Sequence, residues 1–179
     1  VVWDRVSGRR LSVMADHLDQ KVWNARFSPK NPDLIVTACE DGRVRVWRAG
    51  TESVDGREAK KIYDFRGHDG AVYAAVFSPD GESLLTASDD GDAVVWNIAT
   101  GESVVLSHDG PVRDAVFGPD GTTVATGADD HLVRVWNVAD PSAAPQLLFG
   151  HTSRVRSVAF SADGEQLASG GDDQSIILW

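Results

Sequence analysis

A regularly spaced tryptophan constrains this chain more than any other feature. Trp3, Trp47, Trp96, Trp136 and Trp179 follow one another at spacings of 44, 49, 40 and 43 residues. A period of this length is typical of folds built from successive supersecondary units, in which each unit buries its apolar face against its neighbours. We therefore look for one structural unit per tryptophan.

A histidine keeps step with the tryptophans. His17 lies 30 residues before Trp47, and each of the three later histidines of the series lies 28 residues before its tryptophan: His68, His108 and His151. Between histidine and tryptophan come strand-forming runs such as VYAAVF, turns written SPDG, GPDG or SADG, and an acidic pair. Proline fixes φ, aspartate bonds the local backbone and glycine accepts positive φ, so the turns predict hairpins.

The secondary structure is expected to be all β. The strand-forming runs are short and separated by turn signals, and no segment repeats apolar residues at the helical spacing. Several runs, including VYAAVF, are apolar on both faces, which suits a sheet packed between two other sheets.

These residues resemble the WD-repeat β-propeller family, and the resemblance covers essentially the whole chain. Its marks are GH at 67–68 and 150–151, SH at 107–108, DH at 16–17, and an aspartate six residues before each later tryptophan. The literal Trp-Asp dipeptide occurs only at residues 3–4. The resemblance implies blades of four antiparallel strands, a to d. Residues 1–179 are expected to form part of a propeller, with repeats at about 1–16 (partial), 17–50, 68–99, 108–139 and 151–179.

The resemblance also implies a buried hydrogen-bond network in each repeat, from the histidine through a hydroxyl on strand b and the turn aspartate to the tryptophan. The donor and acceptor capacities of these side chains match. The four expected sets are His17, Thr37, Asp41 and Trp47; His68, Thr86, Asp90 and Trp96; His108, Thr126, Asp130 and Trp136; and His151, Ser169, Asp173 and Trp179.

The same residues invite chemical readings that the repetition argues against. A histidine, a hydroxyl and a carboxylate suggest a hydrolase triad, but the trio recurs in four repeats and no G-x-S-x-G motif is present. SDDGDAVVW lacks the glycine and glutamate of an EF-hand loop. His131 in a b–c turn is read as exposed. We expect no catalytic residue, no metal and no cofactor, with a propeller enzyme as the alternative.

Family members commonly bind proteins or peptides on the top face, where the d–a and b–c loops gather, and loops on a rigid scaffold often carry function. Mapped onto this sequence, the top-face positions are Lys21, Trp23, Glu40, Tyr73, Asp89, Arg113, Asp129, Arg154, Arg156 and Asp172. Trp23, Glu40, Tyr73 and Asp89 combine aromatic rings with carboxylates, which favours a lysine or arginine of a basic peptide. Arg113, Arg154 and Arg156 would form an oppositely charged sector. The alternative for Trp23 is packing beneath its loop.

Composition limits the partner class. The net charge of −10 argues against nucleic acid, because duplex binding depends on lysine and arginine. No run of apolar residues is long enough to span a membrane, and a lone Cys39 fits a reducing compartment. We expect a non-catalytic cytoplasmic scaffold or sensor domain for protein contacts within a larger multidomain protein. A purely structural repeat without a ligand is the other alternative.

The chain begins and ends in a strand c, at Trp3 and Trp179, which predicts a segment of a larger propeller with exposed sheet edges. The rival is a ring of two copies, in which residues 10–14 of one chain would complete the last blade of the other. The segment RAGTESVDGREAKK, residues 48–61, is expected to be a solvated c–d loop.

Overall fold

The computed structural model describes residues 1–179 except 4, 9, 15, 18 and 50–58, and for residues 10–12 it describes the backbone only. Its regular elements are strands, grouped into antiparallel sheets. The three complete sheets have four strands each. They are β3 (Val22–Phe27), β4 (Leu34–Cys39), β5 (Arg43–Arg48) and β6 (Lys60–Arg66); β7 (Val72–Phe77), β8 (Ser83–Ser88), β9 (Asp92–Asn97) and β10 (Ser103–Ser107); and β11 (Val112–Phe117), β12 (Thr123–Ala128), β13 (Val133–Asn137) and β14 (Gln146–Leu148).

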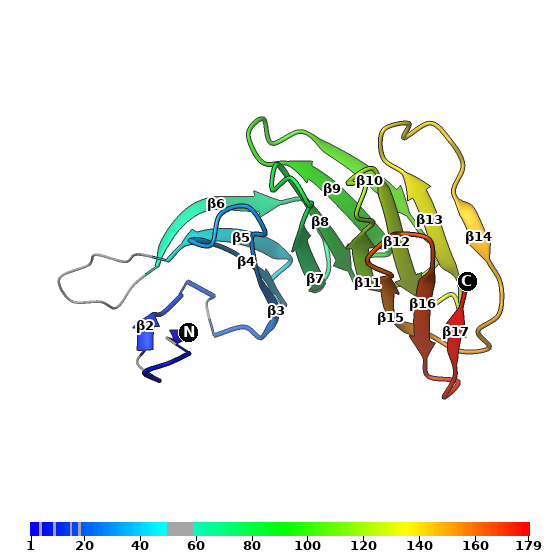
Figure 1. Cartoon of the computed structure of the whole chain (residues 1–179), viewed down its shortest axis with the longest axis horizontal. Helices are drawn as coiled ribbons and strands as arrows, with labels where there is room; N and C mark the ends of the chain where they lie inside the picture. Colours follow the sequence, from blue (N-terminus) through cyan, green and yellow to red (C-terminus); the bar gives the residue numbers. More distant parts are fainter. Residues whose placement is uncertain (4, 9, 15, 18, 50–58) are drawn as a thin grey trace.

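Partial sheets lie at both ends of the chain. β15 (Val155–Phe160), β16 (Leu167–Gly171) and β17 (Ile176–Leu178) form a three-stranded sheet, and β1 (Val2–Trp3) pairs with β2 (Arg10–Ser12). We call the sheets that begin with β3, β7, β11 and β15 blades 1 to 4. Each is an up-and-down meander in chain order, and the four follow one another along an arc (Figure 1). This is a segment of a β-propeller, as the sequence predicted.

The hydrophobic cores lie between successive blades. Val36 and Val46 of blade 1 pack in one cluster with Leu84 and Trp96 of blade 2. A second cluster joins blades 2 and 3, and a third joins blades 3 and 4. The first strands also pack against one another from blade to blade, β3 on β7, β7 on β11 and β11 on β15. This arrangement explains strands that are apolar on both faces, because an inner blade is covered on both sides.

The turns follow the sequence signals. In the a–b turn of blade 2, the Gly81 N–H donates to the Ser78 carbonyl over 2.9 Å, and Asp80 Oδ1 accepts from the Glu82 N–H at 2.9 Å. Gly81 has φ of +76°, which a side chain would disfavour. In the b–c turns, Gly42 and Gly91 have positive φ, and blades 3 and 4 place His131 and Gln174 in that same conformation.

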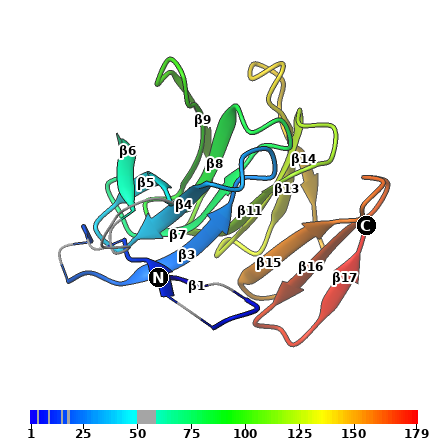
Figure 2. The same ribbon diagram turned by 60° about the vertical axis from the view of Figure 1, so that its left-hand side comes forward.

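The two ends of the arc are less covered than its middle. Trp3 and Phe27 are 60% and 57% exposed at one end, and Ile176 and Leu178 are 80% and 70% exposed at the other. Figure 2 shows β17 at the edge of its sheet, beside the C-terminus. These are the sheet edge and the apolar faces that the sequence predicted.

The long c–d connection of blade 1 is shorter than its prediction at both ends. Arg48 is the last residue of β5 and residues 60 and 61 belong to β6, where Lys60 pairs with Arg48, so both strands extend into the segment that was expected to be loop. Residues 50–58 of that segment lie outside the described residues. Among the described residues, no helix is long and apolar enough to cross a membrane.

Candidate functional site

A hydroxyl on the second strand is the centre of a buried hydrogen-bond network in each blade. In blade 2, the Trp96 indole N–H donates to Thr86 Oγ1 over 3.0 Å, and Thr86 lies 2.7 Å from His68 Nε2. The indole can only donate, so the hydroxyl oxygen accepts this bond, and the same hydroxyl also donates to the Val94 carbonyl over 3.2 Å. The same contacts, over 2.7–3.1 Å, join His17 and Trp47 to Thr37, His108 and Trp136 to Thr126, and His151 and Trp179 to Ser169.

The turn aspartate completes this network in two of the four blades. In blade 2, His68 Nδ1 lies 2.9 Å from Asp90 Oδ2, and in blade 4, His151 Nδ1 lies 2.8 Å from Asp173 Oδ2. Each carboxylate also accepts a backbone N–H from the loop before strand a, that of Asp69 or Thr152. The aspartate therefore connects the b–c turn to the d–a loop of its own blade.

In the other two blades an arginine takes the aspartate, which the sequence analysis did not predict. Arg45 Nη1 and Nη2 donate to Asp41 Oδ1 and Oδ2 over 3.2 and 2.5 Å. Arg134 Nη1 lies 2.7 Å from Asp130 Oδ2. Among the described residues, no hydrogen bond joins either aspartate to its histidine. The expected networks that include Asp41 and Asp130 therefore need correction.

One sequence position determines which partner the aspartate has. Two residues before the strand-c tryptophan, blades 1 and 3 have Arg45 and Arg134, whereas blades 2 and 4 have Val94 and Ile177. Arg45 binds its turn carboxylate in a bidentate geometry that imidazole cannot match, and Arg134 forms an ion pair with its own through one nitrogen. The signal was visible in the sequence as a cation at an otherwise apolar position.

Asp130 pairs with Arg134 and not with His108, and His108 is neutral in the folded protein at pH 7. The stability of the chain should therefore depend on pH through this histidine. Burial, together with the nearby Arg134 guanidinium, lowers the pKa of His108 from 6.5 to about 4. Between these values the unfolded chain binds a proton that the folded chain does not, so stability falls as the pH falls. Going from pH 7 to pH 5 is expected to cost about 2 kcal/mol through this group.

Urea unfolding of the chain and of His108→Gln at both pH values would measure this contribution. We expect the loss of stability on acidification to be smaller in the variant by about that amount. Equal losses in both proteins would show that His108 titrates alike in the folded and unfolded states.

The top-face positions come from matching places in the four blades. Trp23, Tyr73, Arg113 and Arg156 are each the second residue of the first strand of their blade, and together they line a hollow of about 370 Å³. A bulge follows the first residue of each of these strands, because Val22, Val72, Val112 and Val155 pair out of step with the residues after them. These four side chains, which the sequence analysis mapped to the top face, therefore lie together around one hollow.

The acidic residue before each turn aspartate pairs with a side chain of its own blade. Lys21 Nζ lies 3.2 Å from Glu40, and the Tyr73 hydroxyl donates to Asp89 over 2.8 Å. Arg113 binds Asp129 through Nε, at 2.7 Å, and through Nη2. Arg156 donates to both oxygens of Asp172, over 2.8 and 2.6 Å. Arg154 Nε approaches Asp129 at 3.4 Å.

Contacts between blades join the pairs of blades 1 to 3 to one another, and Arg154 of blade 4 reaches Asp129; we call these side chains, together with Arg156 and Asp172, the ring. The Trp23 and Tyr73 rings meet edge to face with centroids 5.7 Å apart. The Arg113 guanidinium lies over Tyr73 at 4.7 Å, and its Nη1 donates to Asp89 over 3.4 Å. The aromatic and arginine sectors expected from the sequence are therefore in direct contact. Trp23 is 47% exposed and does not pack fully beneath its loop.

The ring contains equal numbers of cationic side chains and carboxylates. Its four cations, Lys21, Arg113, Arg154 and Arg156, face four carboxylates, Glu40, Asp89, Asp129 and Asp172. The Arg113 hydrogen bond lowers the pKa of Asp129, and that of Arg156 lowers the pKa of Asp172. Burial and the hydrogen bond to Asp89 raise the pKa of Tyr73. These pKa shifts keep Asp129 and Asp172 ionised and Tyr73 protonated at neutral pH, which suits binding better than proton transfer.

The described residues contain no group of three or more histidine, cysteine or acidic side chains placed to hold a metal ion. The only cysteine, Cys39, is buried in β4, and burial raises the pKa of its thiol. His131 is exposed on the b–c turn of blade 3, in agreement with its reading from the sequence.

Comparison with known proteins agrees with the fold. The WD40 family, described as "WD domain, G-beta repeat", matches residues 8–48, 59–97, 102–137 and 144–179. The chain is 26% identical over 108 residues to the guanine nucleotide-binding protein subunit beta of Oryza sativa subsp. japonica, and 32% identical over 109 residues to that of Nicotiana tabacum. Each match covers 58% of this chain and 27% of the relative.

A third relative is the histone acetyltransferase type B subunit 2 of Aspergillus fumigatus, which is 33% identical over 87 residues, or 48% of this chain and 20% of that protein. These matches span about a quarter of the relatives' length or less. The family match covers most of the chain, and each matched segment spans the last strand of one sheet and the first three strands of the next, as residues 59–97 span β6 to β9. This chain belongs to the WD40 family of G-beta-type repeat proteins.

Proposed function

We propose that this chain is a non-catalytic interaction module that binds a protein or peptide segment on its top face. The observation that carries the proposal is the hollow lined by Trp23, Tyr73, Arg113 and Arg156, one residue from each blade. Large aromatic and arginine side chains at a hollow are the residues that dominate binding energy at protein interfaces. The relatives named as subunits, of a nucleotide-binding protein and of an acetyltransferase, support a role in protein assembly.

We propose further that the bound segment presents a lysine or arginine side chain. Lys21 Nζ already lies 5.4 Å from the centre of the Trp23 ring, so this ring face accommodates a cation. The Lys21 side chain is 68% exposed and bonded to Glu40, and a partner cation could replace it without uncovering apolar surface. Asp89 is the other contact, since its side chain is 47% exposed and its Oδ2 accepts no hydrogen bond from the described residues.

Two other functions, catalysis and nucleic-acid binding, have less support. A propeller enzyme would need reactive groups beyond the repeated positions, and the polar groups of the ring are already paired with one another. Nucleic acid is disfavoured by the net charge of −10. The lone buried thiol of Cys39 supports our placement of the protein in the cytoplasm.

The proposal can be tested by selecting peptides from a randomised display library on the 179-residue chain. We expect sequences with lysine or arginine to be enriched, and their affinity to fall at least about tenfold for Trp23→Ala combined with Tyr73→Ala. Tyr63→Ala is the matched control, because Tyr63 is an exposed aromatic residue on β6, outside the ring.

Each outcome of the selection decides between the readings. Peptides that bind the double variant as tightly as the parent chain would disprove the top-face site. Enrichment of acidic peptides that bind the double variant more weakly than the parent chain would support the top-face site and disprove the basic partner. A selection without enrichment would favour the purely structural repeat.

A further inference from the structure

A second hollow lies at the opposite end of the blades from the top face. It has a volume of about 370 Å³ and is formed by the a–b turns of blades 3 and 4. We call it the lower groove, and define it by Pro119, Asp120, Thr123, Phe160, Ala162 and Asp163. Arg156 is the second residue of β15 and Phe160 is its last, so the groove lies roughly 13 Å along the strand from the ring.

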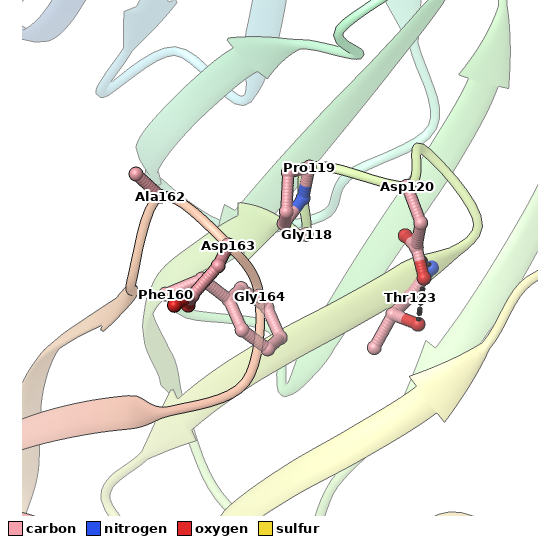
Figure 3. Close-up of a pocket in the computed structure, with 8 residues that line it drawn as sticks. All are labelled: Gly118, Pro119, Asp120, Thr123, Phe160, Ala162, Asp163 and Gly164. Carbon is pink, nitrogen blue, oxygen red and sulfur yellow. Dashed lines mark hydrogen bonds between the residues drawn. The ribbon is translucent and has the colours of Figure 1, made fainter.

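The lower groove combines an apolar lining with two carboxylates. Figure 3 shows Pro119 between the side chains of Asp120 and Asp163, with the Phe160 ring beside Asp163 and Gly164. Phe160 is half-buried, and its inner side packs against the core between blades 3 and 4. An alkyl chain could lie on Phe160 and Pro119 while its charged end meets the carboxylates.

Local hydrogen bonds hold both carboxyl groups ionised. Asp120 Oδ2 accepts from the Thr123 hydroxyl at 2.6 Å, and Oδ1 accepts from the Thr123 N–H at 2.8 Å. Asp163 Oδ1 accepts from the Ser161 hydroxyl at 2.5 Å and from the Glu165 N–H at 3.1 Å. The hydroxyl bonds lower the pKa of both carboxyl groups. The turns therefore position two negative charges on neighbouring blades.

The equivalent place between blades 1 and 2 contains a lysine supplied by the chain itself. Lys30 occupies the position in the a–b turn of blade 1 that Asp120 occupies in blade 3. Its Cβ lies 3.2 Å from where a Cβ on Gly81 would be, so it packs against the next blade's turn. The Ser78 hydroxyl lowers the pKa of Asp80, and the charge of Lys30 contributes to the same shift. The turns of blades 1 and 2 thus place the cation Lys30 near Asp80. The turns of blades 3 and 4 place two aspartates, Asp120 and Asp163, at the equivalent position.

No cation in the second half of the chain can balance the lower groove. Residues 67–179 contain four arginines and no lysine against 17 acidic residues, a difference of −13. All four arginines, Arg113, Arg134, Arg154 and Arg156, form ion pairs with acidic residues of the b–c turns, at the other end of the blades. The charge at the groove is therefore uncompensated within its own half of the molecule.

From this complementarity we propose that the lower groove docks a flexible segment of a partner protein that carries a lysine beside aliphatic residues. The lysine stem lies on Phe160 and Pro119, and its ammonium group lies between Asp120 and Asp163, in the role that Lys30 has toward Asp80. This surface is separate from the top face and does not depend on the function proposed for it.

The probe for this site is the peptide acetyl-GLKLG-amide, titrated into the ¹⁵N-labelled 179-residue chain and followed by NMR. We expect saturable shifts of the Gly121 and Gly164 amides, which lie in the two turns. The double variant Asp120→Asn with Asp163→Asn is expected to bind roughly fivefold more weakly. Asparagine retains the Oδ1 acceptor of the backbone N–H groups in both turns, and only the Thr123 side chain loses its Oδ2 partner, so the variant should fold.

Asp80→Asn combined with Asp140→Asn is the matched control, because it removes the same charge from aspartates outside the lower groove. We expect this control to bind like the parent chain, and acetyl-GLELG-amide to give no saturable shift. Equal weakening in the control, or unchanged binding in the groove variant, would overturn the proposal. Shifts of Gly121 and Gly164 that grow with protein concentration alone would assign the groove to a second copy of the chain and overturn the peptide proposal.

Discussion

Replacing Arg45 by alanine is expected to lower the free energy of unfolding by about 3–5 kcal/mol. The Arg45 side chain is fully buried in blade 1, and the carboxylate that it binds, Asp41, is only 12% exposed. Burial is the largest influence on Asp41 and acts against its ionisation, but the hydrogen bonds from Arg45, Cys39 and the Arg43 N–H, together with the charge of Arg45, outweigh it and lower the pKa of this carboxyl group. The alanine variant would leave a nearly buried charge without its partner, which costs more than the pair itself contributes.

Urea unfolding followed by tryptophan fluorescence would measure this effect. Arg43→Ala is the control, since Arg43 lies two residues away, is 30% exposed and approaches Asp64 only at 3.8 Å. Its loss should cost less than about 1 kcal/mol. Similar stabilities for the two variants would show that the Asp41–Arg45 pair does not support blade 1.

Thr86→Val is expected to destabilise the chain by about 2–4 kcal/mol without changing the shape of the side chain. Thr86 is fully buried, and its hydroxyl accepts from the Trp96 N–H and is hydrogen-bonded to His68 Nε2. Valine has nearly the same volume but no hydroxyl, so the Trp96 N–H and His68 Nε2 would both lose their partner. Each unsatisfied buried group costs about 1–3 kcal/mol.

Thermal unfolding of Thr86→Val beside Thr152→Val isolates the hydroxyl from the general effect of the substitution. Thr152 is exposed in the loop before strand a of blade 4, and its backbone N–H, not its side chain, donates to Asp173. Its replacement should leave the melting temperature nearly unchanged. A melting temperature of Thr86→Val equal to that of the control would contradict a structural role for the hydroxyl network.

The hydroxyl network was predictable because its members lie at fixed offsets within one blade. Thr86 and Trp96 lie on neighbouring strands, β8 and β9, whose register is set by a short turn. Repetition of such a set in four blades therefore specifies its geometry. The partner of the turn aspartate was predicted correctly in only two of the four blades. It depends on one residue, two positions before the strand-c tryptophan, which is arginine in blades 1 and 3 and apolar in blades 2 and 4.

The top face shows the limit of inference from a repeat. The positions of Trp23, Tyr73, Arg113 and Arg156 followed from their place in each strand. Their contacts did not, because Arg113 of blade 3 lies on Tyr73 of blade 2 and shares Asp89 with it. Such a contact depends on how two blades are placed side by side, which no offset within a repeat specifies.

The sequence by itself determined the all-β class and the hairpin turns, since both follow from local spacing and from the conformational preferences of glycine, proline and aspartate, and its resemblance to the WD-repeat family implied the hydroxyl network. Only the tertiary structure decided that Asp41 and Asp130 bind arginines, that the top-face charges are paired, and that Asp120 and Asp163 share one groove. These features depend on distances between side chains that become neighbours only when blades pack, where small differences in reach and burial determine which partner an ionised group takes.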